Sequence, residues 1–172
     1  MTVALDRPQR HAPASQIGLV EEFLLLTLED SGGEFDSVPE IYLNCGIAGA
    51  ALMDLALRDR IDSDLDGAFA VDTTPTGDEI LDQALADIIR EPRRLGAQHW
   101  ITHLSRSAPA RRQAALSNLC ARGILRQSDH AFLWVLKERR YPVVDGQKRQ
   151  EAKKRILALL CNDDIPTSPT PR

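Results

Sequence analysis

The chain has 172 residues, of which 43% are hydrophobic, and a formal charge of −4 at pH 7. This length suits one core that buries about 70% of the unfolded surface, so we expect a single domain. The first 16 residues contain no apolar run, and three widely spaced cysteines show no C-x-x-C pair. These features argue against a signal peptide and a disulfide framework, and they predict a cytoplasmic protein in a reducing compartment.

Charge is unevenly distributed along the sequence. Residues 20–87 contain 17 acidic and 2 basic residues, a net charge of −15, whereas residues 88–172 contain 17 basic and 7 acidic residues, a net charge of +10. This asymmetry predicts that the second part of the chain binds an anion.

The first half of the chain is organised around one apolar segment. We expect a tail at 1–16, a helix at Ile17–Leu28 that runs into a short extended piece, and a loop at Glu34–Glu40. From Leu43 to Leu57 only two residues are clearly polar. Such a segment predicts a buried central helix that other helices surround, and its 15 residues fall short of the roughly 20 that span a bilayer.

The remaining elements are two hairpins and four helices. We first expect a hairpin of Arg60–Ser63 and Ala68–Asp72 across Asp64–Gly67, and then a helix that starts at the Thr76/Glu79 capping box and ends at Pro92. Two helices follow at about Leu95–Leu104 and Pro109–Arg122, and the second is capped by Ser107 and ended by Gly123. The chain then continues with a hairpin of Ile124–Arg126 and Ala131–Leu136 across Gln127–His130, a loop at Tyr141–Asp145, a helix at Gln147–Leu160, and a proline-rich tail at 163–172. The prediction is therefore a mainly α fold. It is a single globular helical domain at 17–162, around a buried central helix, with short β-hairpins.

Motifs for catalysis or metal binding are weak. His99 and His103 have the spacing of two metal ligands, but Trp100 follows His99 where a zinc protease has its glutamate, and no third ligand is identifiable. Alternating aspartates at 62, 64 and 66 lack the glycine and glutamate that a calcium loop requires. We therefore predict that the protein is not an enzyme and has neither a metal site nor a cofactor.

The strongest functional signal is the segment Ser105–Ser128, which contains five arginines and no acidic residue. Arg111 and Arg112 fall in the first turns of the expected Pro109–Arg122 helix, and Arg106 precedes it. Free backbone N–H groups and the helix dipole favour an anion at such a position, and arginines bind phosphate through two parallel hydrogen bonds. We predict a phosphate-binding face of Arg106, Arg111 and Arg112, with a merely solvated basic face as the alternative.

Seven sequence blocks, taken in order, resemble the Golgi phosphoprotein 3 family. They are LVEEFLLLTLED, GIAGAALMDLALRDRI, TPTGDEILDQAL, HWITHLS, LSNLCARGIL, FLWVL and RRYPVVD, and the resemblance covers about Gly18 to Asp163. It implies a peripheral membrane protein that binds phosphatidylinositol 4-phosphate through a flat basic face. In eukaryotic members it also implies an adaptor for the cytosolic tails of glycosyltransferases. Family chains usually continue with further C-terminal helices, so we expect a short, bacterial-type member with part of its core uncovered.

The headgroup pocket of the family aligns only in part. Its tryptophan and its central-helix arginine fall on Pro39 and Ala48, and of its two further arginines one falls on Arg112 and the other on Pro109. Arg111 and Arg106 are close enough in sequence to substitute. The resemblance thus implies a headgroup site with one retained pocket residue, and it leaves the identity of the anionic lipid open.

The predicted function is non-catalytic binding of phosphatidylinositol 4-phosphate or another anionic headgroup, peripheral to the membrane, with membrane-enzyme tails as further partners. The alternative is a winged-helix-like nucleic-acid-binding module, because three helices over about Glu79–Arg122 precede a hairpin. A sequence pI near 5.6 and the acidic first half favour the lipid over nucleic acid. A third possibility is a scaffold that oligomerises through the Ile124–Leu136 hairpin.

Overall fold

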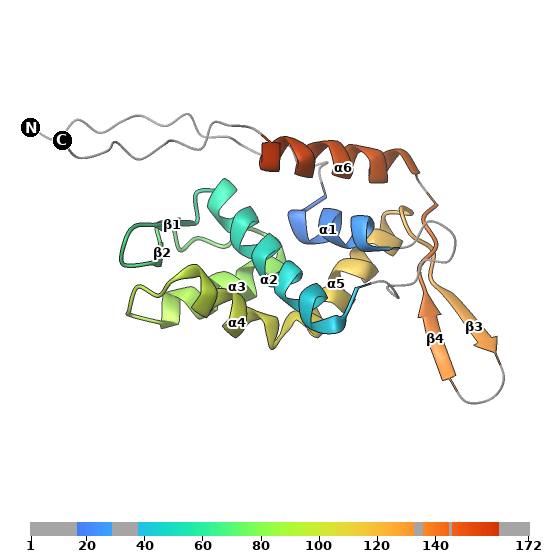
Figure 1. Ribbon diagram of the computed structural model, residues 1–172, viewed down its shortest axis with the longest axis horizontal. Coiled ribbons are helices and arrows are strands. Elements are labelled where there is room, and N and C mark those ends of the chain that lie inside the picture. Colours follow the sequence, from blue (N-terminus) through green and yellow to red (C-terminus); the bar gives the residue numbers. More distant parts are fainter. Residues whose placement is uncertain (1–16, 29–37, 133–135, 145, 162–172) are drawn as a thin grey trace, which may run out of the picture.

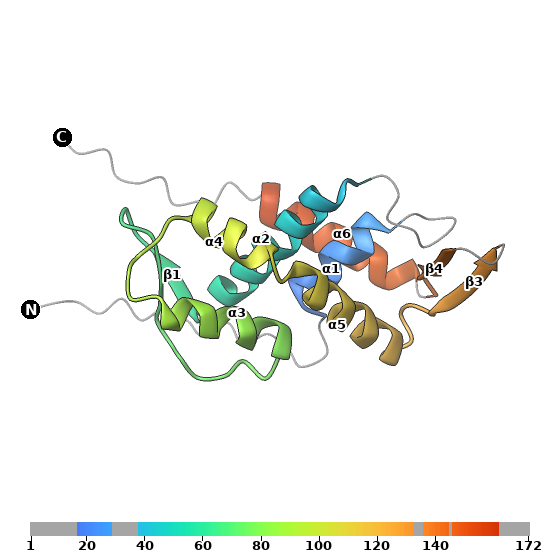
Figure 2. The same ribbon diagram turned by 90° about the horizontal axis from the view of Figure 1, so that it is seen from below.

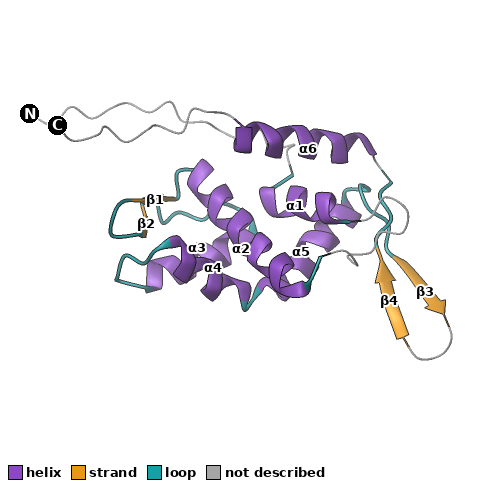
Figure 3. Ribbon diagram, in the orientation of Figure 1, coloured by secondary structure: helices purple, strands orange, loops and turns teal. Residues whose placement is uncertain are grey.

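The computed structural model describes residues 17–28, 38–132, 136–144 and 146–161 (Figure 1). The elements are α1 (Leu19–Thr27), α2 (Glu40–Leu57), β1 (Ile61–Ser63), β2 (Ala68–Ala70), α3 (Glu79–Arg90), α4 (Ala97–Ser105), α5 (Ala108–Ala121), β3 (Ser128–Phe132), β4 (Leu136–Arg140) and α6 (Gly146–Cys161). Helices dominate this part of the chain (Figure 3), which confirms a mainly α domain with short hairpins. The predicted tails at 1–16 and 163–172 lie outside the described residues.

Helix α2 lies in the middle of the fold, but only one side of it is buried. Figures 1 and 2 show it crossing between α1 and α6 on one side and α3 and α4 on the other. Its buried positions are Leu43, Ile47, Ala48, Ala51, Asp54 and Leu55. The remaining positions are exposed or half-buried, and only 39% of the helix is buried overall. Within the described residues, other helices therefore pack on the inner side of α2, and its outer side is exposed or half-buried.

The length of α2 also differs from the prediction. The helix begins at Glu40, directly after Pro39, and reaches 18 residues. Within the described residues it is the one helix long and apolar enough to cross a membrane by length and composition. The inner side of α2 packs in the core of this fold, and core packing explains its length and apolar composition without a membrane.

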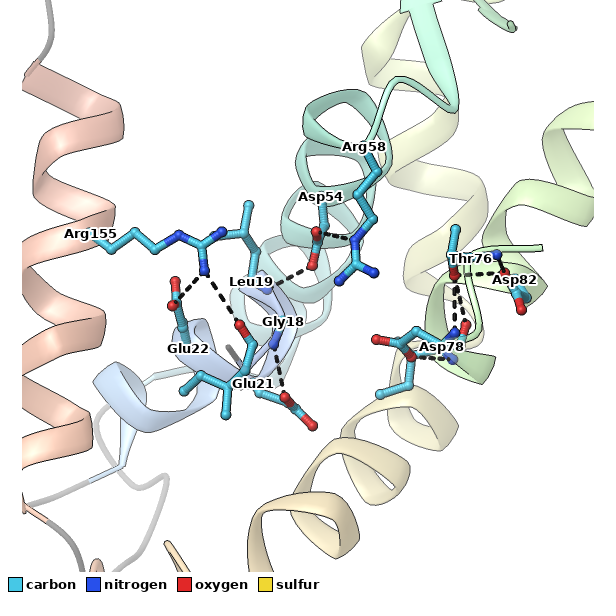
Figure 4. A network of polar contacts seen from close by, with 12 residues as sticks. Gly18, Leu19, Glu21, Glu22, Asp54, Arg58, Thr76, Asp78, Asp82 and Arg155 are labelled. Atoms are coloured by element: carbon cyan, nitrogen blue, oxygen red, sulfur yellow. Dashed lines mark hydrogen bonds and ion pairs between the residues drawn. The ribbon is translucent and has the colours of Figure 1, made fainter. Parts of the chain in front are cut away.

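Helix α1 is attached to its neighbours through buried carboxylates (Figure 4). Asp54 on α2 accepts a hydrogen bond from the Leu19 backbone N–H at 2.8 Å and another from Arg58 Nε at 2.9 Å. Glu22 on α1 accepts a hydrogen bond from Arg155 of α6 at 2.9 Å. Together these contacts join α1, α2 and α6, which are far apart in sequence.

A second α1 carboxylate connects the helix to α5. Glu21 accepts a hydrogen bond from the Gly18 backbone N–H at 2.9 Å and lies 3.5 Å from the guanidinium of Arg122. Both glutamates of α1 are more than nine-tenths buried. A buried carboxylate destabilises the fold unless it is paired, so the fold requires Arg122 and Arg155 as partners of these glutamates.

The first predicted hairpin is confirmed. Strands β1 and β2 pair antiparallel, with Ile61 opposite Ala70, and Asp64–Gly67 forms the turn. Gly67 has a φ of +132°, and a Cβ there would lie 2.5 Å from the Leu95 carbonyl carbon, so this position requires glycine.

The second predicted hairpin has a different register. The structure pairs Ser128–Phe132 with Leu136–Arg140, whereas the sequence analysis placed the strands at Ile124–Arg126 and Ala131–Leu136. Leu125 instead bridges to Val143, and the Val144 N–H donates to the Ile124 carbonyl at 2.9 Å. These contacts align the two segments so that the turn falls beyond Phe132. The predicted Tyr141–Asp145 loop therefore takes part in pairing.

Two predicted helix caps are also wrong in detail. The N-cap of α3 is Asp78, whose side chain accepts from the Ile80 N–H at 2.9 Å, while Thr76 donates to Asp82. Ser107 does occupy the N-cap position of α5, but its side chain caps no backbone N–H. The first turn of α5 also has no acidic residue, so no carboxylate of that turn offsets the partial positive charge of the helix N-terminus.

The buried Glu22 gives a pH prediction. Burial raises the pKa of the Glu22 carboxyl above its ordinary value of 4.5, and the Arg155 guanidinium opposes this shift without reversing it. The folded state therefore holds this proton more tightly than the unfolded state. The resulting stabilisation is complete below the unfolded pKa and is lost as pH rises through the folded pKa.

We expect Glu22→Gln to gain stability relative to the unmodified protein between pH 4 and pH 7, since the amide cannot ionise. The measurement is the free energy of unfolding in urea at several pH values for both proteins. A variant that loses relative stability over this range would show that the Arg155 pair outweighs the effect of burial.

Candidate functional site

The three predicted phosphate-binding arginines lie at the corner between α4 and α5. Arg106 is the C-cap of α4, and Arg111 and Arg112 fall in the first turns of α5. Ser107 joins the two helices, and its hydroxyl donates to the Leu104 carbonyl at 3.2 Å. Pro109 occupies an early helical position of α5, where its missing N–H costs no hydrogen bond.

Arg111 does not face solvent, and the expectation of an open cation is wrong for this residue. Its side chain is only 2% exposed, and one terminal nitrogen donates to the Leu104 carbonyl at 2.9 Å and to Ser107 Oγ at 2.5 Å. The other terminal nitrogen lies 3.9 Å from Asp87 on α3. Burial lowers the pKa of Arg111, with Asp87 opposing the shift. Arg111 therefore holds the corner together from inside.

Arg106 and Arg112 remain accessible at the corner. Arg106 is exposed and makes no ion pair within the described residues. The Arg112 side chain is about one-quarter exposed and lies 3.8 Å from Glu40, a highly exposed carboxylate at the start of α2. A contact of this length to an exposed partner contributes little to stability. The structure thus separates the predicted trio into one buried and two accessible arginines.

The start of α2, adjacent to Arg112, carries a feature that the sequence analysis missed. Ile41 and Tyr42 are 67% and 68% exposed, directly after Glu40. They precede the predicted central helix at Leu43–Leu57, and only the three-dimensional packing identifies them as surface groups on α2. An exposed aromatic and an exposed aliphatic side chain beside an arginine are a combination typical of protein surfaces that contact lipid headgroups.

A depression of about 650 Å³ lies between α3 and the start of α5. Its lining residues are Gly77, Glu79, Asp82, Gln83, Ala86, Asp87, Arg90, Ser107 and Arg111. Asp87 also pairs with Arg90 at 3.0 Å, and Asp82 accepts from Thr76. The lining therefore contains three carboxylates and two guanidiniums, and its net negative charge slightly favours a cationic ligand.

The weak metal motifs do not assemble into a site in the part of the chain that the structure describes. No group of three histidine, cysteine or acidic side chains there is arranged to hold a metal ion. His99 and His103 stack on each other with ring centres 6.1 Å apart, and His103 lies 3.8 Å from Asp87. Asp64 accepts hydrogen bonds from the Asp66 and Gly67 N–H groups, so it shapes the β1–β2 turn.

Comparison with models of known protein families shows which family the chain is related to. A model described as Golgi phosphoprotein 3 (GPP34) matches residues 19–172. The chain belongs to the Golgi phosphoprotein 3 family. This membership is consistent with a non-catalytic protein of the lipid-binding or adaptor type.

Within the Golgi phosphoprotein 3 family, the structure clarifies two aligned positions that differ here. Ala48 is fully buried on the inner side of α2, and Pro39 is the exposed N-cap of the same helix. Neither side chain can donate a hydrogen bond to a phosphate. Among the four aligned pocket positions, Arg112 alone has a side chain with that capacity, and it lies at the α5 N-terminus.

The buried Arg111 and the more accessible Arg112 should contribute differently to the free energy of unfolding. Arg111→Ala should lower the free energy of unfolding by roughly 2 to 4 kcal/mol, because it leaves a cavity and removes the donors of the Leu104 carbonyl and Ser107. Arg112→Ala, which removes a long contact to the exposed Glu40 from a partly exposed position, should change it by less than about 1 kcal/mol. Urea denaturation of the two variants measures both values. Equal losses would contradict the distinct roles of these neighbours.

Proposed function

We propose that this member of the Golgi phosphoprotein 3 family is a peripheral, non-catalytic protein that binds a phosphorylated or otherwise anionic lipid headgroup at the α4–α5 corner. Phosphatidylinositol 4-phosphate is the first ligand to test. Arg106 and Arg112 contact the phosphate, and Arg111 positions them by holding Leu104 and Ser107 in place. The protein acts in the cytoplasm, at a membrane surface.

One observation carries this proposal: the N-terminus of α5 has no acidic residue in its first turn and no side-chain cap, and it lies beside two accessible arginines. A helix N-terminus with free N–H groups favours an anion, and guanidiniums add charge-assisted hydrogen bonds. Ile41 and Tyr42, next to Glu40, would contact the headgroup layer from the adjoining end of α2. Lipid fits this combination better than duplex DNA does, because exposed apolar groups gain nothing from a phosphate backbone.

Binding to vesicles tests the proposal. The double variant Arg106→Glu, Arg112→Glu should bind vesicles containing phosphatidylinositol 4-phosphate at least about 20-fold more weakly, since each basic contact contributes about 1 kcal/mol. Binding of the unmodified protein should also weaken as salt increases. Co-sedimentation with vesicles, with and without the phosphoinositide, measures both effects.

The matched control changes the same number of charges on another face. Lys153 and Lys154 are exposed on α6, which lies across the fold from the α4–α5 corner (Figure 1). Lys153→Glu, Lys154→Glu should retain most of the binding. An equal loss in both double variants would indicate attraction by net charge alone. A salt-sensitive mobility shift with duplex DNA, together with no vesicle binding, would favour the nucleic-acid alternative.

We also propose an adaptor role, in which the depression between α3 and α5 accepts a basic segment of a membrane-protein tail. Glu79, Asp82 and Asp87 supply its carboxylates. Glu79→Arg should weaken binding of a lysine- and arginine-rich peptide about five- to tenfold, whereas Asp66→Arg, on the β1–β2 turn, should not. Fluorescence anisotropy of a labelled peptide measures this difference, and equal effects of the two variants would contradict the assignment.

A further inference from the structure

Glu40 places a carboxylate at the edge of the proposed headgroup site. It is the first residue of α2, and its Oε1 lies 3.8 Å from a terminal nitrogen of Arg112. The Glu40 side chain is 68% exposed, and within the described residues it forms no hydrogen bond. A phosphate bound at Arg112 therefore lies close to a like charge, which repels it unless another group lies between them.

The contributions of Glu40 to the fold are small. An ion pair of 3.8 Å with an exposed carboxylate adds little to stability. An acid in the first turn complements the dipole of α2, and this effect is also weak at an exposed position. Because a carboxylate has two oxygens with about four acceptor positions, most of the hydrogen-bonding capacity of Glu40 is directed to solvent or to a ligand.

The charges around Glu40 favour a neutral donor over a cation. An ammonium group at Glu40 would meet the guanidinium of Arg112 at the same carboxylate, and also the positive end of the α2 dipole. Arg106, exposed at the α4–α5 corner, adds a further positive charge to the site. A hydroxyl group carries no charge and donates one hydrogen bond to a carboxylate. The site is therefore suited to a headgroup that presents hydroxyls next to its phosphate.

We propose that Glu40 is a specificity-determining residue of the headgroup site, and that it accepts hydrogen bonds from hydroxyl groups beside the bound phosphate. This inference rests on the proposed function, since it takes the phosphate to lie at Arg106 and Arg112. The ligand class is a phosphate carried on a polyol such as the inositol ring, whose hydroxyls lie on the carbons next to the phosphate. Phosphatidic acid, whose phosphate lacks such neighbours, is disfavoured.

Glu40 discriminates in both directions. A hydroxyl that donates to Glu40 adds a hydrogen bond to a charged group, which is stronger than a hydrogen bond between neutral groups. Without such a donor, the carboxylate stays unpaired beside the phosphate and repels it. Specificity of this kind combines an attractive element for one ligand with a repulsive element against another.

Vesicles of two compositions test the inference. One contains phosphatidylinositol 4-phosphate and the other contains phosphatidic acid, at fractions that give equal surface charge. The unmodified protein should bind the phosphoinositide vesicles about tenfold more tightly. Glu40→Gln should reduce this ratio to about twofold, mainly because binding to phosphatidic acid becomes stronger once the negative charge is removed. Co-sedimentation measures both affinities.

Glu151→Gln is the matched control. It is the same substitution at an exposed position of α6, and it should keep the ratio of the unmodified protein. Both variants should unfold at nearly the unmodified Tm, because each removes an ion pair whose carboxylate is exposed. A purely structural role of Glu40 would change binding to both kinds of vesicle by the same factor and leave the ratio as it was.

Three results would overturn the inference. An unchanged ratio in Glu40→Gln would show that Glu40 does not distinguish the two headgroups, while the proposed function would stand. Tighter binding of the unmodified protein to phosphatidic acid than to the phosphoinositide would assign the site to a phosphate without neighbouring hydroxyls. Binding to neither kind of vesicle would contradict the proposed function as well.

Discussion

The fold depends on pairing between buried carboxylates of its first two helices and arginines from later in the chain. Glu21, Glu22 and Asp54 are all more than nine-tenths buried, and they contact Arg122, Arg155 and Arg58. Each carboxylate would strongly destabilise the core if its partner were removed. These contacts therefore fix where α5 and α6 sit relative to α1, and they place the α4–α5 corner at one edge of the molecule.

The same pairing changes how the charge asymmetry of the sequence is understood. A net −15 followed by a net +10 predicted an outward-facing anion site. In the structure, arginines of the basic half pair with acids of the other half, as in the contacts of Arg94 with Asp64, Arg111 with Asp87 and Arg112 with Glu40. Much of the asymmetry thus serves internal neutralisation. Among the basic residues that stay accessible, Arg106 and Arg112 lie together at a helix end without a side-chain cap.

Sequence periodicity was sufficient for most helices but not for the direction in which their side chains point. The positions of α1, α3, α4, α5 and α6 and of the β1–β2 hairpin follow from apolar spacing and turn residues. Arg111 and Arg112 are adjacent and alike in sequence, yet they point to different sides of α5, the first inward to Asp87 and the second toward Glu40. The register of β3–β4 depends on the long-range bridge of Leu125 to Val143, which no local pattern encodes. Likewise, apolar composition cannot show which side of α2 is buried and which is exposed or half-buried within the described residues.

The central functional claim is that an anionic headgroup binds at the α4–α5 corner and not elsewhere on the basic half. The most direct measurement is a titration of isotope-labelled protein with the soluble headgroup inositol 1,4-bisphosphate, followed through backbone amide chemical shifts. If the headgroup binds at the corner, saturable shifts are expected at Arg106, Ala110 and Arg112. Shifts confined to Lys153 and Lys154 on α6, or no saturable shifts at all, would contradict it.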